Sequence, residues 1–202
     1  MFALNLLTLA FAATATVALP AAKRDLAPSC NLLGGGAFDT ATNFTLAAWN
    51  TTLPNANNTG VPLVLGQAGA ISGAEFKVFS TFASFPFNQY PSLSLDKGRL
   101  IPHGTDVAPA KAGTVPDGSE PGFIVSNDSD PEQGAQIYCG VADIDPAGHG
   151  TGHPFLAVNG DTDSFALCKA GTQNNIVFKP AAGKGYDLSS CYAVKVQIIE
   201  EF

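Results

Sequence analysis

The stretch from Pro154 to Ile199 reads PFLAVNGDTDSFALCKAGTQNNIVFKPAAGKGYDLSSCYAVKVQII, and its pattern decides the fold. Short apolar runs alternate with segments rich in Gly and Asn, residues that tolerate positive φ and therefore reverse a strand at little cost. We interpret the stretch as an antiparallel meander on which the rest of the chain packs. The four apolar runs are Phe155–Val158, Phe165–Cys168, Ile176–Phe178 and Tyr192–Ile199.

The last of these runs alternates, which is typical of a half-buried strand. One face would carry Tyr192, Val194, Val196 and Ile198. The hairpin signal is clearest in Ser92–His103, where Asp96-Lys97-Gly98 separates two alternating segments. Further strands are expected over 44–49, 61–67, 123–125 and 135–144. The prediction is one all-β domain over residues 25–202, an antiparallel β-sandwich or barrel of roughly ten strands stapled by disulfides, with a β-trefoil as the alternative.

Residues 1–24 have the pattern of a secretory leader. Phe2–Leu19 is apolar with small residues toward its end, as in a signal peptide, and the dibasic pair Lys23-Arg24 follows as a processing site. We therefore expect a mature chain that begins at Asp25 and is secreted, located outside the cell or in the cell wall.

The charge of the chain excludes two classes of partner. The net charge is −7, and removal of the two basic residues at 23 and 24 makes it −9. An acidic surface repels nucleic acid and anionic lipid, and the remaining basic residues are scattered singly. We expect no nucleic-acid partner and, after processing, no membrane association.

Four cysteines follow the leader, and export to an oxidising compartment makes two disulfides the expectation. Four cysteines allow three pairings. We favour Cys168 with Cys191, because they flank the run Ile176–Phe178, which leaves Cys30 with Cys139.

Four N-glycosylation sequons are present, and three of them fall within one short stretch. Clustering behind a leader favours their use, which would place that stretch in solvent. The candidate glycosylated residues are Asn43, Asn50, Asn57 and Asn127.

The segment Ala74–Tyr90 concentrates aromatic residues. Phe is most often a core residue, so a place in the core is the simpler interpretation. Aromatic rings in a loop-and-strand segment also pack on the C–H faces of sugar rings, which makes a wall-polysaccharide platform the functional hypothesis. Its candidate residues are Trp49, Phe85, Phe87 and Tyr90.

One loop gathers groups that could bind a divalent cation. The candidate ligands are Asp143, Asp145, His149 and His153. The glycines between the two histidines oppose the helix that would bring both imidazoles onto one metal. We keep these residues as candidate metal ligands but expect no cofactor.

Sequence patterns that would indicate catalytic residues are weaker than the pattern of the candidate metal ligands. No GxSxG nucleophile motif occurs, and a carboxylate pair for glycoside hydrolysis could include Glu75, which stands among aromatic residues. The pattern therefore favours a protein without catalysis, with a secreted carbohydrate-active or metal-assisted hydrolytic enzyme as the alternative.

The order of elements resembles a known family. The leader, the hairpin SLSLDKGRL, the segment GFIVSN and the ending FALC–IVFKP–Cys191 are similar to small secreted fungal cell-wall proteins of the PhiA-like type. That resemblance implies a wall-associated structural or interaction protein with wall polysaccharide or wall proteins as partners, and it supplies no catalytic residues. A secreted effector or inhibitor that acts on a host protein is a further alternative.

Overall fold

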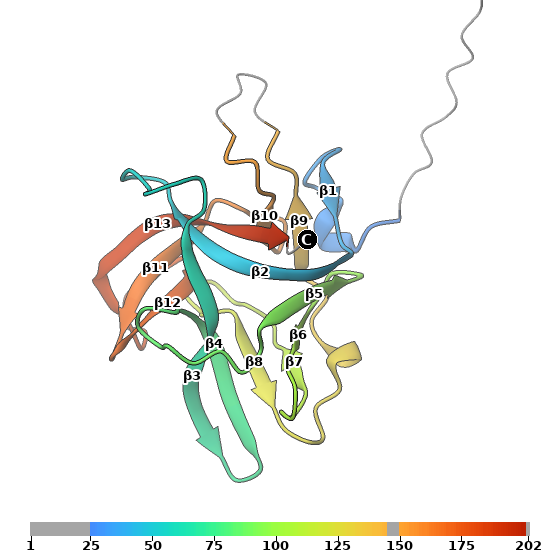
Figure 1. Cartoon of the computed structure of the whole chain (residues 1–202), viewed down its shortest axis with the longest axis vertical. Helices are drawn as coiled ribbons and strands as arrows, with labels where there is room; N and C mark the ends of the chain where they lie inside the picture. Colours follow the sequence, from blue (N-terminus) through green and yellow to red (C-terminus); the bar gives the residue numbers. More distant parts are fainter. Residues whose placement is uncertain (1–24, 145–149, 201–202) are drawn as a thin grey trace, which may run out of the picture.

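The structure, a computed structural model, describes residues 25–144 and 150–200 (Figure 1). This part of the chain contains thirteen β-strands and two short 3-10 helices, and it has no α-helix. No helix in it is long and apolar enough to cross a membrane. The elements are η1 Pro28–Cys30, β1 Ala37–Phe38, β2 Ala41–Asn50, β3 Val61–Ile71, β4 Ala74–Thr81, β5 Ser92–Asp96, β6 Arg99–His103, β7 Ala110–Ala112, β8 Gly122–Val125, η2 Pro131–Gln133, β9 Tyr138–Val141, β10 Phe155–Val158, β11 Phe165–Ala170, β12 Gln173–Phe178 and β13 Asp187–Glu200.

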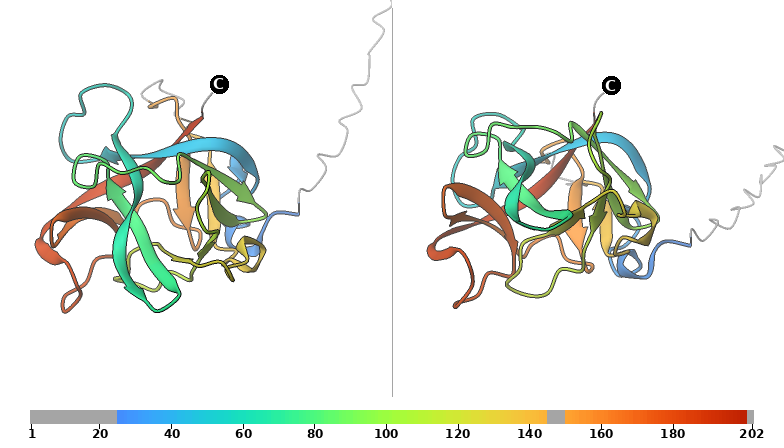
Figure 2. Two further views of the ribbon diagram at one scale, coloured as in Figure 1. Left: turned by 60° about the horizontal axis from the view of Figure 1, so that its bottom comes forward. Right: turned by 90° about the horizontal axis from the view of Figure 1, so that it is seen from below.

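Six strands close into an antiparallel barrel, which confirms the barrel form of the predicted fold. Their order around the barrel is β2-β3-β4-β12-β11-β13, and the pairing of β13 with β2 closes the ring. The closing ladder runs from Val194 opposite Asn50 to Glu200 opposite Phe44, and Figure 2 shows these two long strands side by side.

The remaining strands extend the barrel at three of its members. The hairpin β5–β6 pairs with β2, β8 and then β7 pair with β4, and β10, β9 and β1 follow from β13. After the outer strand β1, the chain forms the barrel strands β2, β3 and β4. The outer strands β5 to β10 come next, and the barrel strands β11, β12 and β13 come last. A β-trefoil would alternate barrel strands and outer hairpins three times, so this order does not match that alternative.

The core fills the barrel and the space under the outer strands. Phe79 of β4 and Phe123 of β8 meet edge to face with ring centroids 5.2 Å apart. Phe165 and Phe178, both fully buried, pack at 5.4 Å on adjacent strands. Aromatic pairs of this kind add to the stabilisation from buried area. Within Ala74–Tyr90 the predicted place in the core holds for Phe79 and Tyr90, whereas Phe82 and Phe87 are exposed.

The predicted meander is wrong in its strand order. β12 lies between β11 and β4, while β13 lies between β11 and β2, and β10 pairs with β9 and the far end of β13. β13 therefore pairs with β11 and β2 and not with β12, the strand before it in sequence, because closure of the barrel requires β13 to reach β2.

The alternation of the last strand holds only in part. Val194, Val196 and Ile198 are buried as predicted, whereas Tyr192 is 38% exposed. The pairing of β11 with β13 is irregular next to Tyr192, between Leu167 and Lys169, so the strand leaves the regular inward pattern there.

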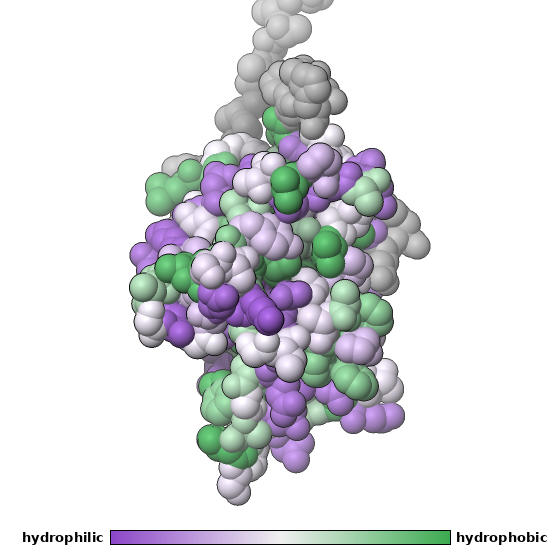
Figure 3. Space-filling model, turned by 90° about the vertical axis from the view of Figure 1, so that its left-hand side faces the viewer, coloured by the Kyte–Doolittle hydropathy of each residue, from purple (hydrophilic) through white to green (hydrophobic). Residues whose placement is uncertain are grey.

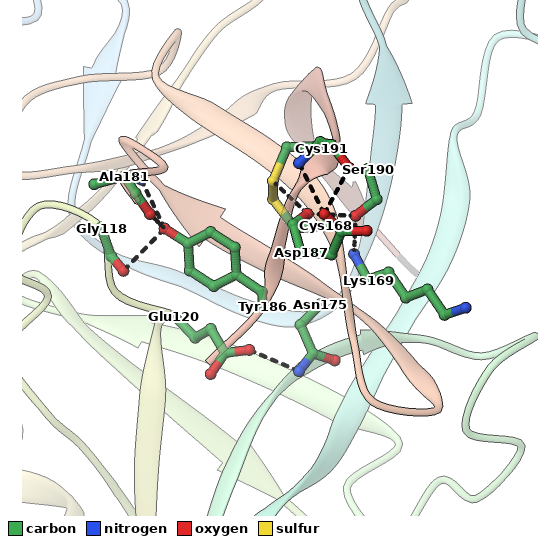
Figure 4. Close-up of a disulfide and its surroundings, with 11 residues drawn as sticks. Gly118, Glu120, Cys168, Lys169, Asn175, Ala181, Tyr186, Asp187, Ser190 and Cys191 are labelled. Carbon is green, nitrogen blue, oxygen red and sulfur yellow. Dashed lines mark hydrogen bonds between the residues drawn. A yellow bond between two sulfur atoms is a disulfide. The ribbon is translucent and has the colours of Figure 1, made fainter. Parts of the chain in front are cut away.

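Both predicted disulfides are confirmed. Cys30–Cys139 ties η1 to β9, and Cys168–Cys191 links the neighbouring strands β11 and β13 at their irregular pairing (Figure 4). The first bridge spans 109 residues and the second spans 23. The longer bridge therefore holds the N-terminal segment onto the middle of the chain.

Candidate functional site

The segment after β4 carries exposed aromatic side chains and is held in place by hydrogen bonds. The backbone N–H groups of Ser84 and Phe85 donate to Thr81 O, each at 3.0 Å. The Ser84 hydroxyl accepts from Asn174 N–H of β12 at 2.9 Å. These contacts anchor the segment to two barrel strands, so its shape does not depend on a ligand.

Three phenylalanines of this segment, Phe82, Phe85 and Phe87, form what we call the aromatic segment. Phe82 is 45% exposed and Phe87 is 62% exposed. The rings of Phe85 and Phe87 meet edge to face with centroids 5.2 Å apart. Large apolar side chains gathered on the surface are more informative than single ones, because such patches often mark interaction sites.

Uncharged polar residues lie next to the aromatic segment in sequence, and others lie on β12, where Asn174 contacts Ser84. Gln173 of β12 binds the backbone of Gln67 on β3 in both directions, since its Nε2 donates to Gln67 O at 2.7 Å and its Oε1 accepts from Gln67 N–H at 3.0 Å. Asn88 and Gln89 follow the aromatic segment and are exposed. Figure 3 faces this side of the molecule, where hydrophobic groups in green lie among hydrophilic ones.

The other two candidate binding residues lie elsewhere. Tyr90 is buried and donates its hydroxyl to Ala108 O at 2.7 Å. Burial raises the pKa of Tyr90, and the nearby Glu75 carboxylate raises it further. Trp49 is half-buried on β2, opposite Lys195 of β13. Tyr90 thus belongs to the core and offers no ring face to a ligand.

Phe82 is the member of this surface that the sequence hypothesis left out. Its N–H donates to Pro62 O at 2.9 Å, which continues the β3–β4 pairing by one step beyond the end of β4. The signal in the sequence is the recurrence of phenylalanine past the end of an alternating strand, into the turn-forming residues Ser84-Phe85-Pro86.

The candidate metal ligands are only partly described. Asp145 and His149 lie outside the described residues. Asp143 accepts from the N–H and the hydroxyl of Thr151 at 2.5 and 3.0 Å, and His153 Nε2 lies 3.4 Å from the hydroxyl of Thr59. Over residues 25–144 and 150–200 no three His, Cys, Asp or Glu side chains are grouped as metal ligands would be. The metal site stays a prediction.

Two arrangements bear on hydrolytic chemistry. Ser94 Oγ and His103 Nε2 are 2.7 Å apart on the hairpin β5–β6, a pair that the sequence did not suggest. In the described part of the chain no carboxylate hydrogen-bonds to His103, so the third group that orients a catalytic imidazole is missing from this pair. Glu75 was a candidate acid because it stands among aromatic residues in the sequence. In the structure its carboxylate forms an ion pair with the buried Lys77 at 3.0 Å, so it is paired with a cation and does not lie among aromatic rings alone.

The sequons lie on exposed or half-exposed backbone. Asn43, Asn57 and Asn127 are exposed and Asn50 is half-buried. Asn50 Oδ1 accepts from Thr52 N–H at 2.8 Å and from Leu53 N–H at 2.9 Å, which folds the sequon into a tight turn. Glycosylation at the four asparagines stays a prediction.

The candidate site is a hydrogen-bonded segment with two exposed rings, Phe82 and Phe87, followed by the amide residues Asn88 and Gln89, and no catalytic group is assembled there among the described residues. The PhiA-like resemblance stays a prediction from the order of sequence elements, and the role of the protein is argued below from its own residues. Comparison with known proteins finds no match to any family model, curated protein or solved structure.

Proposed function

We propose that the chain is a secreted, cell-wall-associated protein that binds an uncharged wall polysaccharide through the aromatic segment and performs no catalysis. The observation that carries the proposal is the exposure of Phe82 and Phe87 on a segment already fixed by hydrogen bonds to Thr81 and Asn174.

Ring faces and amides together suit a sugar polymer. Phenyl rings pack on the C–H faces of pyranoses, as they pack on other flat apolar surfaces. Amide side chains such as Asn88 and Gln89 both donate and accept hydrogen bonds, as sugar hydroxyls do. Since the segment is ordered in advance, binding loses little conformational entropy.

Several features support the proposed location. The leader pattern in residues 1–24 supports export, and two disulfides are compatible with an extracellular protein. The PhiA-like resemblance supports retention in the wall. The enzyme and effector alternatives have no comparable surface observation in their favour.

A pull-down on insoluble chitin, β-glucan and cellulose tests the proposal with residues 25–202. The test variant is Phe82→Ala/Phe87→Ala. The matched control is Leu53→Ala/Leu188→Ala, which removes apolar side chains of similar exposure, 65% and 43%, from other surfaces. We expect retention on at least one polymer, a loss of about tenfold or more in the phenylalanine variant, and no change in the control.

Two results would contradict the proposal. One is a lack of retention on every polymer, and the other is equal retention of the phenylalanine variant and the parent chain. A circular dichroism spectrum of each variant shows whether it is folded, so that a loss of binding is not confused with unfolding.

A further inference from the structure

A groove of about 370 Å³ lies where the hairpin β3–β4 turns and β8 ends, and none of its lining residues belongs to the aromatic segment. Figure 1 shows the tip of this hairpin projecting beyond the barrel, with the end of β8 beside β4. The volume is within the range of small-ligand sites in proteins. The lining residues that the argument uses are Ile71, Ala74, Glu75, Ser126 and Asn127.

Asn127 is also the asparagine of a sequon, which continues with Asp128 and Ser129. It is exposed, in a turn that hydrogen bonds hold in shape. The Ser129 N–H donates to Ser126 O at 3.1 Å, and the Ser129 hydroxyl donates to Ile124 O of β8 at 3.0 Å. The point at which a glycan would be attached is therefore fixed beside the groove.

The other sequons do not share this arrangement, because Asn127 is the one sequon asparagine that lines this groove. Asn57 is exposed in the loop between β2 and β3, where its Oδ1 accepts from Thr59 N–H at 2.9 Å. A sugar on Asn57 has no such groove at its attachment point in this loop. Asn57 therefore serves as the matched comparison for Asn127.

The groove offers apolar and polar contacts of the kind that N-acetylglucosamine uses. Ile71, at the tip of the hairpin, is 64% exposed, and its side chain can pack on the C–H face or the acetyl methyl group of the sugar. The Glu75 side chain is 53% exposed, and only its Oε2 lies at 3.0 Å from Lys77 Nζ. A carboxylate has about four acceptor positions, so Glu75 can also accept from a sugar hydroxyl or amide N–H.

We propose that Asn127 carries an N-linked glycan whose first N-acetylglucosamine lies in this groove against Ile71 and Ala74, and that this sugar holds the tip of the hairpin β3–β4 to the end of β8. The covalent step takes place in the secretory pathway on a lipid-diphosphate-linked oligosaccharide. A bond forms between Asn127 Nδ2 and C1 of the sugar, the bond from C1 to the diphosphate oxygen breaks, and Nδ2 loses one proton.

The attachment makes weak contacts sufficient. A sugar tethered by one side chain has an effective concentration of about millimolar at a groove beside its own attachment point, so it needs little affinity to stay there. This inference rests on the export that the proposed function includes, but not on polysaccharide binding by the aromatic segment, because the two sites share no residue.

The test is the full chain secreted with its leader from a yeast host. Glycopeptide mass spectrometry should show that Asn127 is occupied. Hydrogen exchange of the amides at 70–75 should be about fivefold faster in Asn127→Gln than in the parent, the effect of losing one net hydrogen bond from a local opening equilibrium. Asn57→Gln should leave this exchange within about twofold of the parent.

Two further measurements separate the glycan from the asparagine itself. Ser129→Thr keeps the sequon and should keep both occupancy and slow exchange. Enzymatic trimming of the parent to its first N-acetylglucosamine should also keep slow exchange, and nuclear Overhauser contacts should join the acetyl methyl group to the side chain of Ile71 or Ala74.

Three results would overturn the inference: an unoccupied Asn127 in the secreted chain, equal exchange at 70–75 in Asn127→Gln and the parent, or an absence of contacts between the acetyl methyl group and the groove. Retention of Asn127→Gln on the wall polymers should match the parent. A failure here therefore remains distinct from a failure of polysaccharide binding.

Discussion

Gln197 connects the last strand to the sequon-bearing loop, and its replacement has a calculable cost. Its side chain is 0% exposed. Its Oε1 accepts from Gly60 N–H at 2.8 Å, and its Nε2 donates to Asn58 O at 2.9 Å. The variant Gln197→Leu keeps a side chain of similar size but leaves both backbone groups without this partner.

The expected loss in the free energy of unfolding is about 1.5–4.5 kcal/mol. Gly60 is half-buried, so its unpaired N–H costs about 1–3 kcal/mol, while Asn58 is exposed and its carbonyl regains water, at about 0.5–1.5 kcal/mol. With a urea m value of about 2 kcal/mol/M, the midpoint should fall by about 0.8–2.2 M.

Urea unfolding followed by the fluorescence of Trp49, the single tryptophan, measures this shift. The control is Gln133→Leu in η2, where Gln133 is exposed and bonds only to Asp130, and its midpoint should change little. A midpoint for Gln197→Leu within about 0.25 M of the parent, equivalent to about 0.5 kcal/mol, would refute the reasoning.

Three further predictions concern stability. Replacing both cysteines of the Cys30–Cys139 bridge by alanine should lower the free energy of unfolding by about 5 kcal/mol, and the same change in the Cys168–Cys191 bridge should lower it by about 3.5 kcal/mol. The difference arises because the first bridge closes a loop of 109 residues and the second one of 23. Equal losses in the urea midpoint would argue against this ranking by chain entropy. Burial tends to raise the pKa of Asp161, but hydrogen bonds from residues 163 and 164 lower it overall, so its contribution exists above the unfolded pKa and is lost as pH falls through the folded pKa. The stability gap between the parent and Asp161→Asn should therefore be largest near neutrality and shrink below about pH 4, and a gap that widens in acid would contradict the assignment. Glu75→Gln leaves the ammonium of Lys77 buried without its carboxylate and should lower the free energy of unfolding by about 1–3 kcal/mol. Glu75→Gln combined with Lys77→Met should recover most of that loss in the same unfolding assay. No recovery would mean that the ion pair is not the cause.

The elements that local patterns predicted are those stabilised by neighbours in sequence. The hairpin Ser92–His103 appears as β5 and β6 because its turn residues, with Lys97 and Gly98 both at positive φ, specify the reversal by themselves. The pairing of Cys168 with Cys191 was favoured because these cysteines flank one predicted strand, and Cys30 with Cys139 was the pairing that remained; the structure contains both. Local turn chemistry and alternation need no knowledge of the partner strand.

The sequence identified only part of the candidate site, because the exposure of an aromatic ring depends on which residues pack against it in the folded chain. Phe85 and Phe87 do lie together, but Tyr90 is buried under a contact with Ala108, and Phe82 was missed. Nothing in the spacing of these aromatics distinguishes a ring that faces the core from one that faces water.

Local sequence patterns predicted an all-β fold and the positions of most strands, and they favoured, among three possible pairings, the two disulfides that the structure contains. Only the three-dimensional structure shows that β13 pairs with β11 and β2 and not with β12, that Gln197 is buried against a loop 137 residues away in sequence, and that Tyr192 is 38% exposed. The physical reason is that alternation sets which face of a strand is apolar, whereas barrel closure depends on the combined packing of strands distant in sequence.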